Sequence, residues 1–417
     1  MRIPFSRPAI GEREIEYVTR VLRSGRLSLG PMLEAFESRI AGCVGRRYAV
    51  ATNSGTSALH LMVQALGIGP EDEVLTTSFS FAASANCLLY ERAVPVFVDI
   101  EPATLNLDPR ELQDIVAHDY EWNPARRVLL NRCTGRALKA ILPVHIFGAP
   151  CDLAPILDLA RQYRLRVLED ACEALGAEYQ GRPVGSFGDA AAFAFFPNKQ
   201  ITAGEGGMIV TDSAHIAQLC RSLRNQGRDD SSAWLRHARL GYNYRLSDLH
   251  GALGLAQLER LEELLDARAR VASLYTQVLA GTPEIVLPRD PTTGKRSWFV
   301  YVIRVVAESC VQPRDCLMQR LLERGIDCRP YFTPIHRQPY FQKFRQSTQR
   351  ALPHTDEAAD QCLALPFFPD MTEAQVAEVC GAVREVLRAL PARGEIAPVA
   401  GFAQGGPPIP QPLDQVR

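Results

Sequence analysis

Short apolar runs alternate with helical patterns between residues 47 and 212, and this alternation limits the fold more than any other feature of the chain. Several runs are almost continuously apolar, as strands that are covered on both faces must be. Strands alternating with helices predict an α/β domain built on a mostly parallel sheet. The expected strands are 47–52, 72–77, 94–100, 138–147, 166–171, 189–196 and 207–212, with a first helix at 57–66.

The pattern changes at residue 246, where a long amphipathic helical stretch begins and continues to residue 279. A strand is expected at 297–306 and a helix at 313–325. Together these segments indicate a second, smaller α+β domain that follows the linking helix.

We therefore expect a large domain over residues 1–250, and the linking helix with the small C-terminal domain over 251–392. The segment 121–136 is interpreted as a loop that precedes a core strand. The tail, 393–417, is rich in Pro and Gly and has no periodicity, so we expect it to be disordered.

The composition argues against several classes of protein. The formal net charge of -1 gives no general attraction to nucleic acid or to an anionic membrane. No apolar run approaches the ~20 residues that a bilayer span requires, and the first residues contain no signal core. The 11 cysteines include no C-x-x-C pair, which indicates reduced thiols, and the eight histidines lack metal-ligand spacing. We expect a soluble cytoplasmic protein with no metal and no nucleic-acid or membrane partner.

Two polar features follow predicted strands, where open α/β sheets place their ligands. The first is Asn53-Ser54-Gly55-Thr56, between a strand and a helix. Gly55 permits close approach and a helix N-terminus attracts phosphate, although an ordinary helix cap has the same sequence. The second is Glu169-Asp170 at the end of 166–171, where Asp170 is expected to open a helix. A buried carboxylate there needs a cationic partner, unless it is again a helix cap.

The third feature is Lys199 in "AFFPNKQITAGEGG", between an apolar run and a glycine-rich loop. Such a lysine either extends its amine to solvent or acts as a nucleophile that condenses with a carbonyl. Pyridoxal 5′-phosphate needs an anion cradle, a carboxylate for its pyridine nitrogen and a lysine for its aldehyde. The three features together therefore predict a binding site for this cofactor.

Many further stretches occur in a recognisable order, among them "SGRLSLGPMLEAFE", "LPVHIFGAPCDL", "EDACEALGAEYQGRPVGSFGD", "PNKQITAGEGG", "GYNYRLSDLHGALGLAQLERL" and "LALPFFPDMT". From about residue 3 to 388 the chain resembles the DegT/DnrJ/StrS family of pyridoxal-phosphate aminotransferases. Most members are nucleotide-sugar aminotransferases. The resemblance implies the aspartate aminotransferase-like fold (fold-type I), with a mixed, mostly parallel sheet in the large domain.

The resemblance also implies roles in binding the cofactor. Lys199 corresponds to the lysine that bonds to the aldehyde, and Asp170 to the partner of the pyridine nitrogen. The phosphate would be bound by Ser54, Gly55 and Thr56. Phe81 falls where members place an aromatic ring against the cofactor, although an ordinary core Phe remains an alternative.

Other positions correspond to contacts with a second subunit or with substrate. Asn243 matches a residue that reaches the phosphate held by the neighbouring subunit, which implies at least a homodimer. Arg245 is a candidate for binding substrate anions, or else forms a structural ion pair. Tyr331 and His336 are candidate substrate contacts.

Three positions depart from the family pattern. Many members have Ser where this chain has Ala194, and Gln or His where it has Glu173, close to the phenolic oxygen of the cofactor. A carboxyl group at 173 can itself hold a proton at neutral pH. The third departure is Pro330, which replaces the His of an H-Y-P motif and leaves the sugar specificity open.

The resemblance predicts an enzyme that moves an amino group from an amino acid, by resemblance L-glutamate, to a keto sugar, expected to be nucleotide-linked. Amino-sugar, polysaccharide or glycosylated-metabolite biosynthesis would be its setting. Alternatives are a cyclitol ketone or another secondary-metabolite precursor as acceptor, and a cofactor-bound regulatory protein without turnover. Sugar 3-dehydratases of this type have His in place of Lys199, which disfavours that activity. A desulfurase-like use of Cys172 or Cys328 is also disfavoured, since both are expected to be plain thiols.

Overall fold

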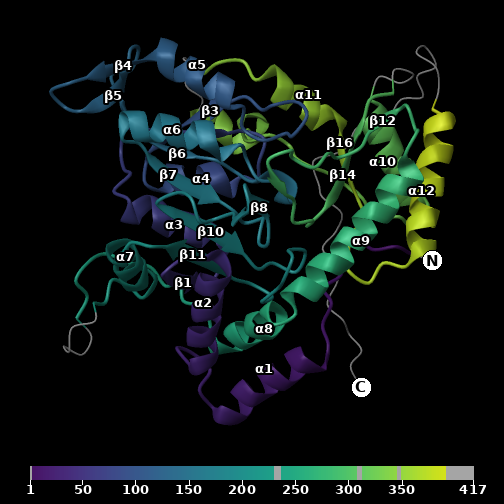
Figure 1. The fold of residues 1–417 in the computed structure, drawn as a ribbon, viewed down its shortest axis with the longest axis horizontal. Helices are drawn as coiled ribbons and strands as arrows, with labels where there is room; N and C mark the ends of the chain where they lie inside the picture. Colours follow the sequence, from purple (N-terminus) through teal and green to yellow (C-terminus); the bar gives the residue numbers. More distant parts are fainter. Residues whose placement is uncertain (1, 230–235, 308–311, 345–348, 391–417) are drawn as a thin grey trace.

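The computed structural model describes residues 2–229, 236–307, 312–344 and 349–390 (Figure 1). Its helices are α1 (Glu12–Ser24), α2 (Pro31–Val44), α3 (Gly55–Ala65), α4 (Ala83–Tyr90), α5 (Pro109–Asp119), α6 (Leu153–Tyr163), α7 (Ala214–Arg224), α8 (Asp248–Leu258), α9 (Leu261–Leu279), α10 (Pro313–Glu323), α11 (Pro353–Gln361) and α12 (Glu373–Arg388). Its strands are β1 (Tyr48–Thr52), β2 (Asp72–Thr77), β3 (Val94–Val98), β4 (Tyr120–Asn123), β5 (Val128–Asn131), β6 (Ala137–Leu142), β7 (Arg166–Asp170), β8 (Glu178–Tyr179), β9 (Arg182–Pro183), β10 (Ala190–Ala194), β11 (Gly207–Thr211), β12 (Ile285–Val286), β13 (Gly294–Lys295), β14 (Tyr301–Val305), β15 (Arg329–Pro330) and β16 (Cys362–Leu365).

Nine strands form the main sheet, in the order β1-β11-β10-β7-β6-β2-β3, with β5 added to β6 and β4 to β5. The neighbours from β10 to β3 pair in parallel, whereas β11 is antiparallel to both of its neighbours. The mostly parallel α/β sheet is therefore confirmed. The strand expected at 138–147 is shorter, because β6 ends at Leu142 before Pro143, which has no N–H for the ladder.

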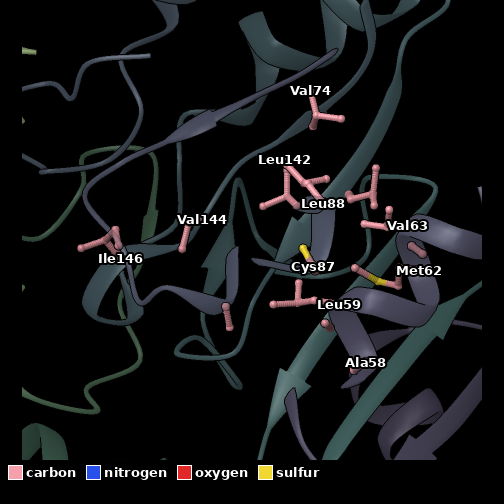
Figure 2. Close-up of a cluster of buried hydrophobic side chains, with 14 of the residues drawn as sticks. Ala58, Leu59, Met62, Val63, Val74, Cys87, Leu88, Leu142, Val144 and Ile146 are labelled. Carbon is pink, nitrogen blue, oxygen red and sulfur yellow. The ribbon is translucent and has the colours of Figure 1, made fainter. Parts of the chain in front are cut away.

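Helices cover both faces of the main sheet, because successive side chains of β10 pack against different helices. Ala190 and Ala192 belong to the same core cluster as the buried residues of α3 and α4. Ala191 and Phe193 pack instead with residues of α2 and α8, as expected when successive side chains point to opposite faces. Figure 2 shows the first of these cores, where α3 side chains such as Leu59 face the sheet.

A second, smaller lobe follows the main sheet in the chain. Its antiparallel sheet has the order β12-β14-β16-β15, and α9, α10 and α12 contribute to the core beside it. The helical stretch expected from 246 to 279 is broken, since α8 ends at Leu258 and α9 begins at Leu261. Figure 1 shows α9 running from the lower part of the large lobe to the small lobe beside α12. The small α+β unit is therefore confirmed.

The expected domain boundary between residues 250 and 251 falls within α8 and stays a prediction. The expected disorder of 393–417 concerns residues outside those that the structure describes. Within the described ranges, no helix has both the length and the apolar character needed to cross a membrane.

The interpretation of 121–136 as a loop is wrong. Most of this segment lies in the hairpin of β4 and β5, and β5 extends the main sheet at β6. The buried carboxylate of Glu73 stabilises the hairpin, because it accepts hydrogen bonds from Tyr120 Oη (2.6 Å) and Asn131 Nδ2 (3.1 Å). The two strands have only four residues each and flank the turn Pro124-Ala125-Arg126-Arg127, so the sequence shows no extended strand pattern.

The expected helix after Asp170 is also absent, and turns follow β7 instead. The Asp170 carboxylate accepts a hydrogen bond from the backbone N–H of Cys172 (3.2 Å), two residues further on. The bond closes a turn at this position, and no helix follows it. Asp170 therefore does not serve as a helix cap.

Candidate active site

A cavity of about 510 Å³ lies at the carboxyl ends of β1, β2, β7 and β10, where the large lobe faces the small lobe. Eight residues singled out from the sequence line it: Ser54, Gly55, Thr56, Phe81, Asp170, Glu173, Lys199 and Tyr331. The chain thus brings into one cavity residues that are up to 277 positions apart in sequence, from 54 to 331.

Lys199 lies on the loop that follows β10, and its side chain is only 14% exposed. Its Nζ is 3.6 Å from Oε1 of Glu173 and 4.2 Å from the centroid of the Phe299 ring. The amine is therefore directed into the protein and not extended to solvent. Most basic residues of this chain are arginines, and its lysines are only Lys139, Lys199, Lys295 and Lys343. Lys199 is the lysine that lines the cavity.

Asp170 is fixed at the end of β7 by its backbone and by its side chain. Its N–H donates to the carbonyl O of Pro143 (2.9 Å), and its own carbonyl accepts from the N–H of His145 (3.0 Å). Its Oδ2 accepts a hydrogen bond from Ser84 Oγ (2.7 Å), which in turn bonds to Ser80 Oγ (2.7 Å). Both serines line the cavity and were missed from the sequence, where only their closeness to Phe81 could have indicated them.

Glu169, the neighbour of Asp170, has a different environment. It is fully buried and accepts hydrogen bonds from three backbone N–H groups within 185–188. His145 Nε2 lies 3.3 Å from it and carries a proton, because Nδ1 accepts from the N–H of Cys151. Burial alone would raise the pKa of Glu169, but His145 and the backbone donors lower it overall. Glu169 therefore anchors a loop, whereas Asp170 faces the cavity.

Glu173 is the second carboxyl group of the cavity. Its Oε2 accepts a hydrogen bond from the N–H of Phe147 (2.9 Å), and Oε1 faces the amine of Lys199. Burial raises the pKa of Glu173, and the charge of Lys199 offsets only part of that rise. The two side chains thus form a pair in which a proton has two places to reside.

The start of α3 forms an opening for an anion. Ser54 Oγ accepts a hydrogen bond from the N–H of Ser57 (3.1 Å) and so caps the helix. The N–H groups of Gly55 and Thr56 donate no hydrogen bond to any described residue. A Cβ on Gly55 would lie 2.7 Å from Cβ of Ala194, so only glycine lets α3 pack this closely on β10. Such a helix start is suited to bind phosphate.

Aromatic side chains form much of the remaining surface. Phe81 is 64% exposed, which excludes the alternative of an ordinary core Phe. Phe299, Tyr331 and Phe332 close the cavity from the small lobe. Tyr331 Oη lies 3.5 Å from Asn198 Nδ2, and burial raises the pKa of Tyr331.

Three residues singled out from the sequence lie outside the lining of this cavity: Asn243, Arg245 and His336. Asn243 is exposed, and Arg245 donates a hydrogen bond to Asn225 Oδ1 (2.8 Å). His336 bonds through Nδ1 to Ser78 Oγ (2.7 Å) and through Nε2 to Asp356 Oδ1 (3.0 Å). The roles of these three residues stay predictions, as do the roles of the candidate residues that line the cavity.

Neither Cys172 nor Cys328 has the environment of a reactive thiol. Cys172 lines the cavity, and burial raises the pKa of its thiol well above the ordinary value. Cys328 is fully buried away from the cavity. Across the described ranges, no three His, Cys, Asp or Glu side chains are grouped to hold a metal ion.

Comparisons with known proteins identify the family of the chain. Residues 8–384 match the sequence profile of the DegT/DnrJ/EryC1/StrS aminotransferase family. The chain is 38% identical over 392 residues to GDP-perosamine synthase of Caulobacter vibrioides, covering 93% of this chain and 98% of that protein. It is 36% identical over 397 residues to spore coat polysaccharide biosynthesis protein SpsC of Bacillus subtilis, covering 93% and 97%.

The fold is also similar to that of solved structures. DesI, crystallised in the presence of its TDP-sugar product, superposes with a TM-score of 0.80 and 31% identity, covering 93% of this chain and 94% of DesI. The expected aspartate aminotransferase-like architecture is confirmed. From its fold, its cavity and the match over residues 8–384, the chain belongs to the DegT/DnrJ/EryC1/StrS family and is an aminotransferase.

Proposed function

We propose that this protein is a pyridoxal-phosphate-dependent aminotransferase that moves an amino group from L-glutamate to a nucleotide-linked keto sugar. The observation that carries the proposal is that Lys199 and Asp170 line one cavity together with the open start of α3. An amine, a fixed carboxylate and an anion cradle are the three groups by which this cofactor is bound.

The residues present fit the cofactor. The N–H groups of Gly55 and Thr56 donate to no described residue and are available to a phosphate. The Asp170 carboxylate accepts one hydrogen bond at each oxygen and has lone pairs left for a ring N–H. The exposed ring of Phe81 offers a flat apolar face in the same cavity. When bound, pyridoxal phosphate supplies an aldehyde that bonds to amines and a ring that accepts the electrons of a broken Cα–H bond.

The side chains that line the cavity are assigned different roles in holding protons and excluding water. Asp170, oriented by Ser84, is assigned to hold a proton on the pyridine nitrogen. Lys199 Nζ, between Glu173 and the Phe299 ring, is assigned to carry the proton that leaves the donor Cα. Glu173 can hold a proton beside that amine, because burial favours its neutral form. The aromatic side chains from the small lobe exclude water from these transfers.

We also propose that the working form is a homodimer. Asn243, predicted to reach the phosphate held by the neighbouring subunit, is exposed and therefore available for such a contact. The nearby Leu240 is 85% exposed, which is unusual for a large apolar side chain unless a partner covers it. We expect the enzyme to act in the cytoplasm.

The acceptor is inferred from the relatives. GDP-perosamine synthase and DesI act on nucleotide-linked sugars, as their names and product state. The test is incubation of the cofactor-loaded protein with L-glutamate and a panel of nucleotide-linked 3-keto and 4-keto sugars, with product masses measured. A gain of one amino group by at least one sugar is expected. If every sugar stays unchanged while a cyclitol ketone is aminated, the proposed substrate class is wrong.

A further inference from the structure

A buried arginine of α9 contacts the loop that carries Lys199. Arg268 is only 2% exposed. Its Nη2 donates a hydrogen bond to the carbonyl O of Lys199 (2.7 Å), and its Nη1 donates to the carbonyl O of Phe299 (3.2 Å). Lys199 and Phe299 also meet through their side chains, with the amine 4.2 Å from the ring centroid. One guanidinium group is therefore hydrogen-bonded to the backbones of both residues, Lys199 and Phe299.

The charge of Arg268 is not explained by an ion pair. Within the described ranges it forms no salt bridge, and its Nε has no hydrogen-bond partner. Burial lowers the pKa of Arg268 to about 10, so the group still carries a charge at neutral pH. A buried cation without a carboxylate is unfavourable, and an apolar side chain of similar size is often at least as stabilising. Stability alone is thus a poor reason for an arginine at this position.

The neighbouring residues of the loop are held by other groups. Gln200 Nε2 donates to the carbonyl O of Glu173 (2.6 Å) and of Ser297 (3.1 Å). The N–H of Thr202 donates to Gln257 Oε1 (3.3 Å). These bonds fix the loop beyond Lys199, whereas Arg268 bonds to Lys199 itself.

We propose that Arg268 is a positioning residue, which holds the Lys199 backbone and the Phe299 ring so that the amine stays directed into the cavity. The proposal rests on the role proposed for Lys199. The contacts that carry it belong to the chain alone, so it can be tested on cofactor-free protein as well as on the enzyme.

The chain offers a matched control on the same helix. Arg270 is exposed and also donates to backbone carbonyls, those of Pro369 (3.5 Å) and Met371 (3.1 Å), and not to those of Lys199 and Phe299. The variants are Arg268→Met, Arg268→Lys and Arg270→Met. Methionine keeps the unbranched stem of the side chain without the guanidinium donors, and lysine keeps the charge and one donor group.

The first readout is the rate of reductive methylation at each lysine of the cofactor-free protein, measured by peptide mass spectrometry with formaldehyde and cyanoborohydride. The exposed Lys295 and Lys343 serve as internal references. Arg268→Met is expected to raise the relative rate at Lys199, because the amine is no longer confined against Glu173 and Phe299. Arg268→Lys should lie between this variant and the wild type, and Arg270→Met should match the wild type.

The second readout is turnover of the loaded enzyme with L-glutamate. Misplacement of the amine by about 1 Å is expected to lower kcat by roughly 10²-fold in Arg268→Met, with the KM for L-glutamate unchanged and partial rescue in Arg268→Lys. Equal labelling of Lys199 in Arg268→Met and the wild type would overturn the proposal, as would equal effects of Arg268→Met and Arg270→Met. If the wild type aminates no sugar, the proposed function fails while the labelling experiment still decides the role of Arg268. If Arg268→Met does not fold, the labelling of Lys199 in Arg268→Lys decides the role of Arg268.

Discussion

The cavity has two walls that differ in how they are held. The strand wall, made of Asp170, Glu173 and Lys199 with the start of α3, comes from consecutive parts of one sheet. The small-lobe wall, made of Phe299, Tyr331 and Phe332, meets it from segments that pack against the sheet from outside. Asp170 is fixed by four hydrogen bonds, whereas the Tyr331 hydroxyl is contacted by Asn198 Nδ2 at 3.5 Å.

This difference indicates that the two walls have different functions. Groups held by a sheet keep one geometry, as catalysis on a bound cofactor requires. A wall formed by aromatic side chains on connecting segments can change its shape and residues without disturbing the sheet. We infer that the strand wall determines the reaction, and that the small-lobe wall contributes more to the choice of acceptor.

The largest effect is expected for replacement of Lys199, which tests whether the strand wall determines the reaction. Lys199→Ala should abolish transamination with L-glutamate, lowering the rate by at least roughly 10³-fold, because no other described lysine lines the cavity. The matched control is Lys295→Ala, which removes an exposed lysine. Substantial turnover by the Lys199 variant would refute the assignment of the strand wall to the reaction.

A second test exploits the two neighbouring carboxylates. Asp170→Asn keeps the shape but removes the charge, and it should lower kcat by roughly 10²- to 10³-fold while the protein stays folded. Glu169→Gln should instead lower the melting temperature, because Glu169 is fully buried and accepts four hydrogen bonds. The comparison would fail if the two variants exchanged these effects.

A third test addresses the small-lobe wall. Tyr331→Phe should raise the KM for the sugar acceptor by roughly tenfold, the effect of one lost hydrogen bond, and leave the half-reaction with L-glutamate unchanged. Tyr340→Phe is the control, since the Tyr340 hydroxyl also contacts an asparagine, donating to Oδ1 of Asn86 (2.6 Å), but lies outside the cavity. An equal loss in both half-reactions would show that Tyr331 serves the chemistry instead.

The smallest effect is expected for the pH dependence of stability. The folded state raises the pKa of Glu173 above its ordinary 4.5, so the neutral form is favoured by folding. This contribution to stability is fully present below pH 4.5, the ordinary pKa. It is lost as the pH rises through the raised pKa that Glu173 has in the folded state. The side chain at position 173 cannot ionise in Glu173→Gln. The melting temperature of this variant, relative to that of the wild type, should therefore increase as the pH rises over that interval. Glu12→Gln, on exposed α1 surface, should show no such trend.

Much of the strand wall could be predicted from the sequence, because the position of a residue at the end of a predicted strand already places it at the ligand-binding edge. Lys199, Asp170 and Gly55 were found in this way.

Other parts depend on contacts between distant segments and left no local signal. For Ser84 the sequence offers no more than closeness to Phe81, and its role becomes clear once α4 places it beside Asp170, 86 residues away. Arg268 reads in the sequence as one more charge on an amphipathic helix, although it is buried against the Lys199 loop. The turn after Asp170, where a helix was expected, contains a side-chain bond to the N–H of Cys172 that a helix cap would make equally well, so the local sequence does not distinguish the two.

The central claim is that the amine of Lys199 is the group that bonds to the cofactor. The most direct measurement is to load the protein with pyridoxal phosphate, reduce it with borohydride and locate the added mass by peptide mapping. We predict that the modification lies on the peptide containing Lys199 and on no peptide containing Lys139, Lys295 or Lys343. An unmodified Lys199, or modification spread over the other three lysines, would contradict the account.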